Sequence, residues 1–286
     1  MNVSIFELYG LTVFASIILA SGLSLLGTQL AAKDRAMQTL CMGQGAMLGV
    51  LVGLGLSQTL FNSVHSDHYL PLLLAILCAI LSFFISESMV AIKLASSNTH
   101  FAGFFAALLS GGYLVSSLFP ALENHMAQKY FGDIATLGSF ESNICLGLGC
   151  FLLLIFFFFG RKFSEHSFET MISGKVLRPW KLPHALDILS IVTICTCVQT
   201  VGYLFTIACL FIPTAFASRT LKAGLTKHFV YCIILSSVTT GLGFSLSLVE
   251  SNLPTVPTII ALMVASGFLI KFGMTIFQTR RLAAAK

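Results

Sequence analysis

Long apolar stretches separated by short polar gaps run through the whole chain. This pattern predicts nine helices, at about residues 5–30, 38–62, 69–93, 101–120, 140–160, 184–200, 201–218, 228–249 and 254–276. Most are long enough to cross the roughly 30 Å hydrocarbon core of a bilayer, which takes about 20 helical residues. The pattern therefore predicts an all-α fold, a polytopic transmembrane bundle of 8–9 helices.

The sixth and seventh predicted helices are short and nearly continuous around Gln199 and Gly202. They form either a tight hairpin or one broken helix whose halves meet inside the protein. Non-helical backbone at membrane depth is tolerated only where it is buried in protein or lines a cavity. The uncertainty in the helix count comes from this segment.

The composition leaves little room for anything outside the membrane. Of 286 residues, 56% are hydrophobic and 9% are charged, and the longest polar gap runs only from Arg161 to Pro183. We therefore expect residues 1–286 to form a single transmembrane domain without a soluble domain, a cleavable signal peptide or an enzymatic activity of its own. An ATPase would have to be a partner chain; otherwise the protein uses an ion gradient or does not transport.

Basic residues mark one side of the membrane. All of the 16 Lys and Arg residues except Lys129 lie in the gaps after the first, third, fifth and seventh helices or near the C-terminus. The positive-inside rule then predicts an inner (plasma) membrane protein with its N-terminus outside and its C-terminus in the cytoplasm. Because topology accounts for the net charge of +5, the charge does not indicate nucleic-acid binding.

Polar side chains within the spans are the first candidates for function, since they are costly in lipid. We predict that Glu87 lies in the middle of the third helix, where it forms an ion pair or lines a substrate path. Asp187, one turn into the sixth helix, is expected to be solvated. For Gln44 and Gln199, hydrogen bonding between helices is favoured over a place on the path.

The predicted outer loops carry a second set of candidates: His65, Asp67 and His68 in one loop, and Asp133 in another. Imidazole and carboxylate groups together suit a divalent transition metal, although such loops are ordinarily solvated surface. The sequence has no His pair at i, i+4 on a helix and no recognisable nucleophile or phosphate loop. The eight cysteines lie in apolar stretches without zinc-type spacing, so we expect packing roles and no cofactor.

Two further patterns concern helix packing and partners. Gly45, Gly49 and Gly53 share one face of the second helix, which permits close approach of another backbone, and we favour packing within the chain over a dimer seam. The seventh helix is expected to close at Pro213 and the small residues after it, before a basic turn from Arg219 to Lys227. This turn either docks in another protein's groove or is an ordinary helix end.

Several segments, in the same order along the chain, are similar to signatures of the zinc/manganese/iron ABC transporter permeases. Val201 and Gly202, Leu210 and residues 213–217 resemble the family's "VG…LL…PAATA" pattern. Residues 130–133 resemble "YLFGD", and residues 47–53 resemble "LLGVAFG". Residues 241–245 and 254–257 fall where the family has "GGLTFS" and "P-(S/A)-GP". The resemblance covers about residues 10–275.

The resemblance implies an ABC importer permease that forms a homodimer with a translocation path at its axis. It also implies cytoplasmic ATP-binding subunits docked near Pro213, Ala217, Arg219, Lys222 and Lys227, and an external substrate-binding protein that delivers the cargo. The implied cargo is zinc, manganese or iron.

One departure from the family pattern leaves the cargo open. The family usually carries an Asp and a His four residues apart on its second helix, and these positions are Leu40 and Gln44 here. Leucine cannot bind a metal, and a carboxamide is a weak ligand for Zn²⁺. The alternatives are a permease for a non-metal cargo such as a corrinoid or haem, a gradient-driven secondary transporter that uses Glu87, and a membrane scaffold that does not transport.

Overall fold

The computed structural model describes most of the chain. The described residues are 5–61, 69–91, 97–119, 122, 129–132, 134–173, 182–220, 224–250 and 253–284. At some helix ends within these ranges only the backbone is described.

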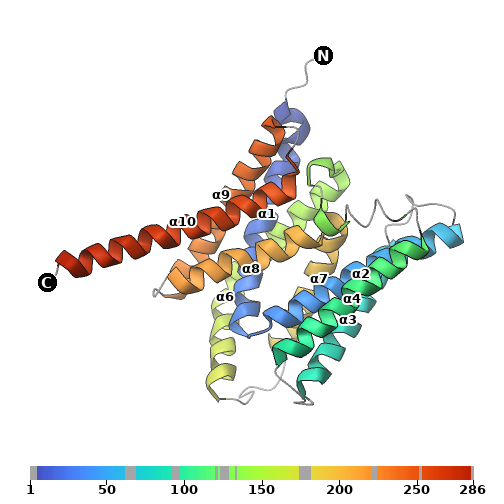
Figure 1. Ribbon diagram of the computed structural model, residues 1–286, viewed down its shortest axis with the longest axis horizontal. Helices are drawn as coiled ribbons and strands as arrows, with labels where there is room; N and C mark the ends of the chain where they lie inside the picture. Colours follow the sequence, from blue (N-terminus) through green and yellow to red (C-terminus); the bar gives the residue numbers. More distant parts are fainter. Residues whose placement is uncertain are drawn as a thin grey trace. The chain divides into compact units, whose positions relative to one another are not determined.

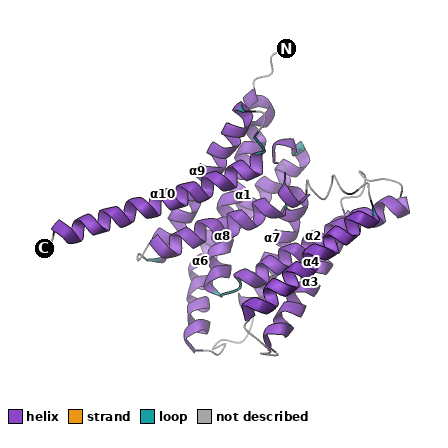
Figure 2. Cartoon of the chain, viewed as in Figure 1, coloured by secondary structure: helices purple, strands orange, loops and turns teal. Residues whose placement is uncertain are grey.

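The described residues form helices and short connections, with no strand among them (Figures 1 and 2). The helices are α1 (Ile5–Ala32), α2 (Ala36–Phe61), α3 (Tyr69–Ala91), α4 (Ser97–Leu118), the 3₁₀ turn η2 (Ile134–Thr136), α6 (Ser139–Ser173), α7 (Leu182–Thr200), α8 (Tyr203–Thr220), α9 (Leu225–Val249) and α10 (Thr255–Ala284). The predicted all-α fold is confirmed, and each predicted helix corresponds to one of these helices.

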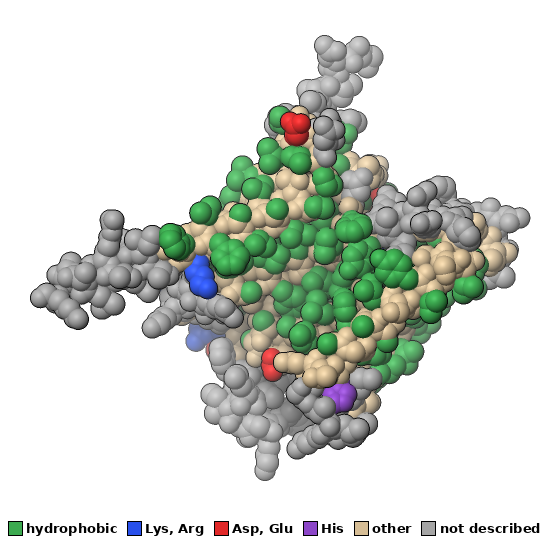
Figure 3. Space-filling view, viewed as in Figure 1, with side chains coloured by type: hydrophobic (Ala, Val, Ile, Leu, Met, Phe, Trp, Pro, Cys, Tyr) green, Lys and Arg blue, Asp and Glu red, His purple; other side chains and the backbone are tan. Residues whose placement is uncertain are grey.

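Within the described residues, seven helices are long and apolar enough to cross a membrane, and α7 and α8 are shorter apolar helices. Large apolar side chains such as Phe157 and Leu118 are exposed on them, at 82% and 74%. Figure 3 shows such side chains spread over the described part of one face, with few charged side chains among them. Exposed apolar surface of this extent is expected where lipid, rather than water, is the solvent.

Two predicted helix ends are wrong. The fifth predicted helix continues past residue 160 to Ser173, because no helix breaker follows and Arg161 pairs with Glu165 one turn later at 2.8 Å. The ninth, predicted to end near residue 276, continues to Ala284. The predicted end of the seventh near residue 218 is confirmed, since α8 ends at Thr220 with Pro213 inside it. A proline within a helix removes one backbone hydrogen bond, and lipid-facing helices tolerate it when neighbouring groups compensate.

The chain divides into two compact units, and each takes segments from several parts of the sequence. Unit 1 consists of Met1–Thr28, Ile134–Phe158 and Ala208–Lys286, and unit 2 consists of Gln29–Asp133 and Phe159–Ile207. The unit boundaries fall inside α1, α6 and α8, so these helices contribute to both. That residues 1–286 act as a single transmembrane domain stays a prediction.

In unit 1, α1 packs closely against three other helices. A Cβ on Gly149 of α6 would lie 2.7 Å from the amide nitrogen of Leu19, and a Cβ on Gly27 would overlap the Leu210 carbonyl of α8. The Ser21 hydroxyl lies 2.7 Å from that of Ser237 in α9. Close backbone approach and hydroxyl pairs are the contacts that hold helices together in lipid.

In unit 2, α2 packs against both α3 and α4, and the three helices lie side by side in Figure 1. A Cβ added to Gly49 or Gly53 would lie 2.4–2.5 Å from backbone atoms of α3, and one added to Gly45 would meet Ser82. The predicted use of these glycines for packing within the chain is confirmed. The α2–α3 contact thus extends from Pro71 to Ser82 along α3.

Candidate functional site

The turn between α1 and α2 determines where two of the basic residues of unit 2 lie. At the end of α1, the Asp34 amide donates to the Ala31 carbonyl and the Arg35 amide donates to the Leu30 carbonyl. This pair of hydrogen bonds defines a Schellman motif, which requires one residue in the left-handed conformation. Asp34 takes that position with a φ of 56°. The motif ends α1 sharply and places Lys33 and Arg35 on either side of Asp34.

Replacing Asp34 by glycine is expected to stabilise the protein. Asp34 is exposed and holds a positive φ, which glycine adopts without the steric cost of a Cβ. We expect a gain of about 0.5–1 kcal/mol, and a loss of similar size for Asp34→Ala. The thermal unfolding midpoint in detergent measures both. Equal midpoints for the glycine and alanine variants would contradict the assigned conformation.

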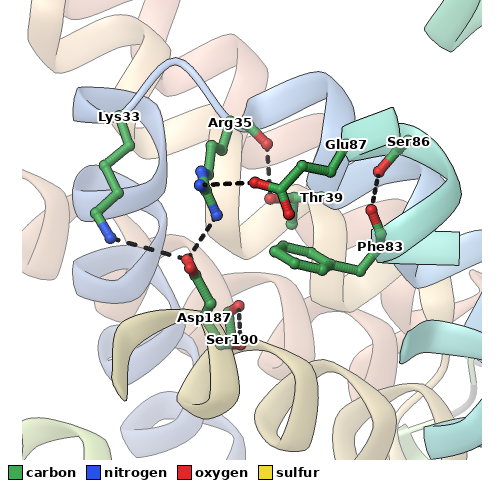
Figure 4. A network of polar contacts seen from close by, with 8 residues as sticks. All are labelled: Lys33, Arg35, Thr39, Phe83, Ser86, Glu87, Asp187 and Ser190. Atoms are coloured by element: carbon green, nitrogen blue, oxygen red, sulfur yellow. Dashed lines mark hydrogen bonds and ion pairs between the residues drawn. The ribbon is translucent and has the colours of Figure 1, made fainter. Parts of the chain in front are cut away.

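Lys33 and Arg35 meet two acids in a group that we call the charge cluster: Lys33, Arg35, Glu87 and Asp187 (Figure 4). Arg35 Nη1 lies 2.8 Å from Asp187 Oδ1, and Lys33 Nζ lies 3.8 Å from the same oxygen. Arg35 Nη2 lies 3.6 Å from Glu87 Oε1, and its guanidinium lies over the Phe83 ring, 5.6 Å from the centroid. The cluster joins the α1–α2 turn to α3 and α7.

The two acids of the charge cluster differ in their exposure to solvent. The Asp187 side chain is 11% exposed, whereas that of Glu87 is 51% exposed. Removing one partner of a buried pair typically costs about 3–5 kcal/mol, but an exposed pair contributes only about 0–1 kcal/mol. Burial lowers the pKa of the Lys33 ammonium, and this effect exceeds the opposing influence of Asp187. The contact with Asp187 is therefore expected to contribute more to stability than the contact with Glu87.

Two predictions about these acids are wrong. Glu87 lies near the end of α3, four residues before Ala91, and not in the middle of the helix. Asp187 is 8% exposed and not solvated, because both basic residues of the α1–α2 turn contact its carboxylate. In the sequence, Lys33 and Arg35 stand out only as topology signals. Lys33 and Arg35 lie on the same predicted side of the membrane as the helix ends that carry Glu87 and Asp187. This common side was the signal that could have revealed the cluster.

A second polar arrangement surrounds the break between α7 and α8. Val201 and Gly202 separate the two helices, and both amides donate to the Cys197 carbonyl. Gly202 has a φ of 96°, and a Cβ on it would lie 2.5 Å from the Gly132 Cα. The Lys129 ammonium donates to the Gln199 carbonyl at 2.5 Å. Lys129, the exception to the charge pattern, thus contacts the C-terminal end of α7, where a positive charge is favourable.

Two tyrosines extend this arrangement to α2. The rings of Tyr130 and Tyr203 lie 5.6 Å apart, and the Tyr203 hydroxyl donates to the Leu40 carbonyl at 3.5 Å. A Cβ on Gly43 would lie 2.9 Å from the Tyr203 ring. The segment with the "YLFGD"-like sequence and the start of α8 therefore pack together against the first half of α2.

The two α2 positions where the related family carries its Asp and His lie one helical turn apart on the same face of α2. Leu40 is half-buried beside Tyr203. Gln44 is 1% exposed, and its Oε1 has no hydrogen-bond partner among the described residues. Gln44 shares a helix face with Leu48 and Leu51, whose side chains face Gly111 and Gly112 of α4. Gln44 thus lies on the side of α2 that packs against α4.

The other site residues predicted from the sequence are the docking and outer-loop candidates. Pro213 and Ala217 are buried in α8, and Lys227 is exposed in the first turn of α9. The backbone of Arg219 belongs to α8, whereas its side chain and Lys222 lie outside the described part. The outer-loop candidates His65, Asp67, His68 and Asp133 also lie outside the described residues.

The described residues do not form a metal centre. No group of three or more His, Cys, Asp or Glu side chains that could hold a metal ion occurs among them. The charge cluster contains two cationic and two anionic groups, so their formal charges cancel. The cluster joins helix ends through ion pairs, and this arrangement indicates no catalytic step.

Residues 6–274 match the sequence model of the ABC 3 transport family. The chain belongs to this family. It is a multi-pass membrane protein and a permease subunit of an ABC transporter. Among curated proteins, none matches the sequence.

Two solved structures share the fold of this ABC 3 family member. PsaBC from Streptococcus pneumoniae, in complex with Fab, is 20% identical, with a TM-score of 0.73 over 95% of this chain and 93% of that chain. An inward-facing transporter described as metal-chelate type is 12% identical, with a TM-score of 0.66 over 93% of this chain and 85% of that chain. At these identities the likeness concerns the fold.

Proposed function

We propose that the chain is the permease of an ATP-driven importer for a divalent transition metal, with zinc, manganese and iron as the candidate cargoes. The match to the ABC 3 transport family over residues 6–274 is the observation that carries this proposal. Two permeases form a homodimer, cytoplasmic ATP-binding subunits supply the energy, and an external binding protein delivers the cargo. The distribution of Lys and Arg supports an outside N-terminus and a cytoplasmic C-terminus.

The ATP-binding subunits dock at the end of α8 and the basic turn that follows it. Lys227 is exposed at the start of α9, so it is available to a partner, whereas Pro213 and Ala217 are buried and would act by shaping the end of α8. A gradient-driven mechanism that uses Glu87 is disfavoured, because Glu87 lies near a helix end, half-exposed and beside Arg35. A carboxylate that carries protons across a membrane is expected deeper in the bundle.

Charge reversal at the basic turn is expected to abolish uptake. Arg219→Glu combined with Lys222→Glu places acidic groups where we expect the ATPase to bind, which replaces attraction by repulsion. The permease is produced with its ATPase and binding protein, and cargo uptake into ATP-loaded vesicles is measured. Arg161→Glu combined with Lys162→Glu is the matched control, since these basic residues lie on the same predicted side. Normal uptake with Arg219→Glu and Lys222→Glu would contradict the docking assignment.

A permease for a metal chelate or a non-metal cargo is the second candidate function. Leu40 and Gln44 replace the family's metal-binding pair, and the Gln44 side chain lies on the face that packs against α4. The similar inward-facing structure is described as metal-chelate type. Uptake of zinc, manganese and iron ions, compared with uptake of a corrinoid and of haem, separates the two candidates. ATP-driven uptake of the corrinoid or haem alone would exclude the free-metal proposal.

A further inference from the structure

Arg35 is held by two acids with contacts of unequal strength. Asp187 lies 2.8 Å from one guanidinium nitrogen and is buried, whereas Glu87 lies 3.6 Å from the other and is half-exposed (Figure 4). Exposed ion pairs break readily, and breaking a buried pair leaves an uncompensated charge. The end of α3 can therefore leave Arg35 far more easily than the start of α7 can.

The packing of α3 agrees with this difference. From Pro71 to Ser82, α3 lies against the glycines of α2, where its backbone approaches closely. After Ser82, Arg35 contacts α3 through the Phe83 ring and the Glu87 carboxylate. Most of α3 is thus held by tight packing. In its last turns Ser86 is buried, and the cation–π contact and the long ion pair are the contacts with the α1–α2 turn.

Separation of Glu87 from Arg35 would not leave a buried charge without a partner. Arg35 would keep its contact with Asp187, and Lys33 would keep its own contact with the same carboxylate. The half-exposed Glu87 would gain hydration in place of the guanidinium. The remaining ion pairs of the charge cluster therefore do not require the end of α3 to stay bound.

We propose that Arg35 is a positioning residue for transport, which keeps Asp187 bound throughout while Glu87 and the end of α3 bind and release it as the transporter changes state. This inference rests on the proposed function as an ATP-driven permease. In this proposal the α1–α2 turn stays attached to the start of α7, and the end of α3 moves relative to both.

Hydrogen exchange of the assembled transporter tests this proposal. The complex with its ATPase subunits is compared in the nucleotide-free state and in the presence of a non-hydrolysable ATP analogue, over backbone amides of residues 84–91. We expect exchange there to differ by about threefold or more between the states, with little difference at the start of α7. In Glu87→Gln the difference should disappear. Arg35→Lys should have the same effect, because lysine has one terminal nitrogen in place of the two that face Glu87 and Asp187 separately.

Glu165→Gln is the matched control, since Glu165 is also half-exposed and pairs with an arginine, Arg161. It should keep the difference in exchange, whereas the Glu87 and Arg35 variants should also transport less cargo for each ATP hydrolysed. The double variant of Arg35→Lys and Glu87→Gln should be no worse than Arg35→Lys alone, because Arg35→Lys already removes the only contact that Glu87→Gln removes.

The outcomes separate this inference from the proposed function. If the wild-type complex drives ATP-dependent uptake but residues 84–91 exchange equally in both states, the positioning role is overturned and the permease function stands. Additive losses in the double variant would also overturn it. If the wild-type complex shows no ATP-dependent uptake of any cargo tested, the proposed function fails, and this inference fails with it.

Discussion

Asp187→Ala is expected to destabilise the protein by about 3–5 kcal/mol, because it removes the shared partner of two cationic groups. The Asp187 side chain is 11% exposed, and both Lys33 and Arg35 contact its Oδ1. Without it, two positive charges would remain close together in a largely buried place. The unfolding free energy, measured by denaturant titration of the purified protein in detergent micelles, reports this loss.

A matched control and a compensating variant identify the cause of this loss. Glu165→Ala removes an exposed pair with Arg161 and should change stability by less than about 1 kcal/mol. Adding Lys33→Met and Arg35→Met to Asp187→Ala should recover most of the loss, since a buried ion-pair group can be replaced by apolar side chains at little cost. A loss from Asp187→Ala no larger than that of Glu165→Ala would contradict the burial of the charge cluster.

Gly202→Ala is expected to have the second large effect, a loss of about 2–5 kcal/mol. The φ of 96° at Gly202 is unfavourable for any residue with a Cβ, which costs about 1–2 kcal/mol. The new Cβ would also lie 2.5 Å from the Gly132 Cα, and such overpacking costs about 1–3 kcal/mol more. The same denaturant titration measures this loss.

Gly103→Ala in α4 is the matched control for this substitution. Nothing lies within 4 Å of a Cβ added to Gly103, and alanine favours a helix more than glycine does. This variant should be neutral or more stable by up to about 1 kcal/mol. If Gly202→Ala were as well tolerated as Gly103→Ala, the close contact between the Gly132 segment and the α7–α8 break would be wrong.

The helices were predictable because each apolar stretch of the required length has one stable conformation in lipid. Backbone groups within a bilayer must be satisfied inside the segment, so a run of about 20 apolar residues becomes a helix. The ends were less predictable. The continuation of α6 to Ser173 depends on a local side-chain pair, Arg161 with Glu165, which the apolar periodicity does not contain.

The candidate site was predictable in part. The sequence predicts an interruption around Gln199 and Gly202, as a tight hairpin or a broken helix, because two short helices follow each other without a polar gap. The partner of this break, the segment from Lys129 to Gly132, was recognised only through its resemblance to a family signature. Contacts between residues about 70 positions apart, such as Lys129 with Gln199, leave no periodic signal in the sequence.

The sequence by itself determined that this protein is a helical membrane permease, since hydrophobic length and the order of short motifs are properties of the chain alone. Only the tertiary structure decided what its charged residues do. Lys33 and Arg35 are ordinary topology signals until α7 brings Asp187 to them, and Glu87 is half-exposed because α3 ends nearby. Ion pairing and burial depend on which helix ends meet, and that is a property of packing.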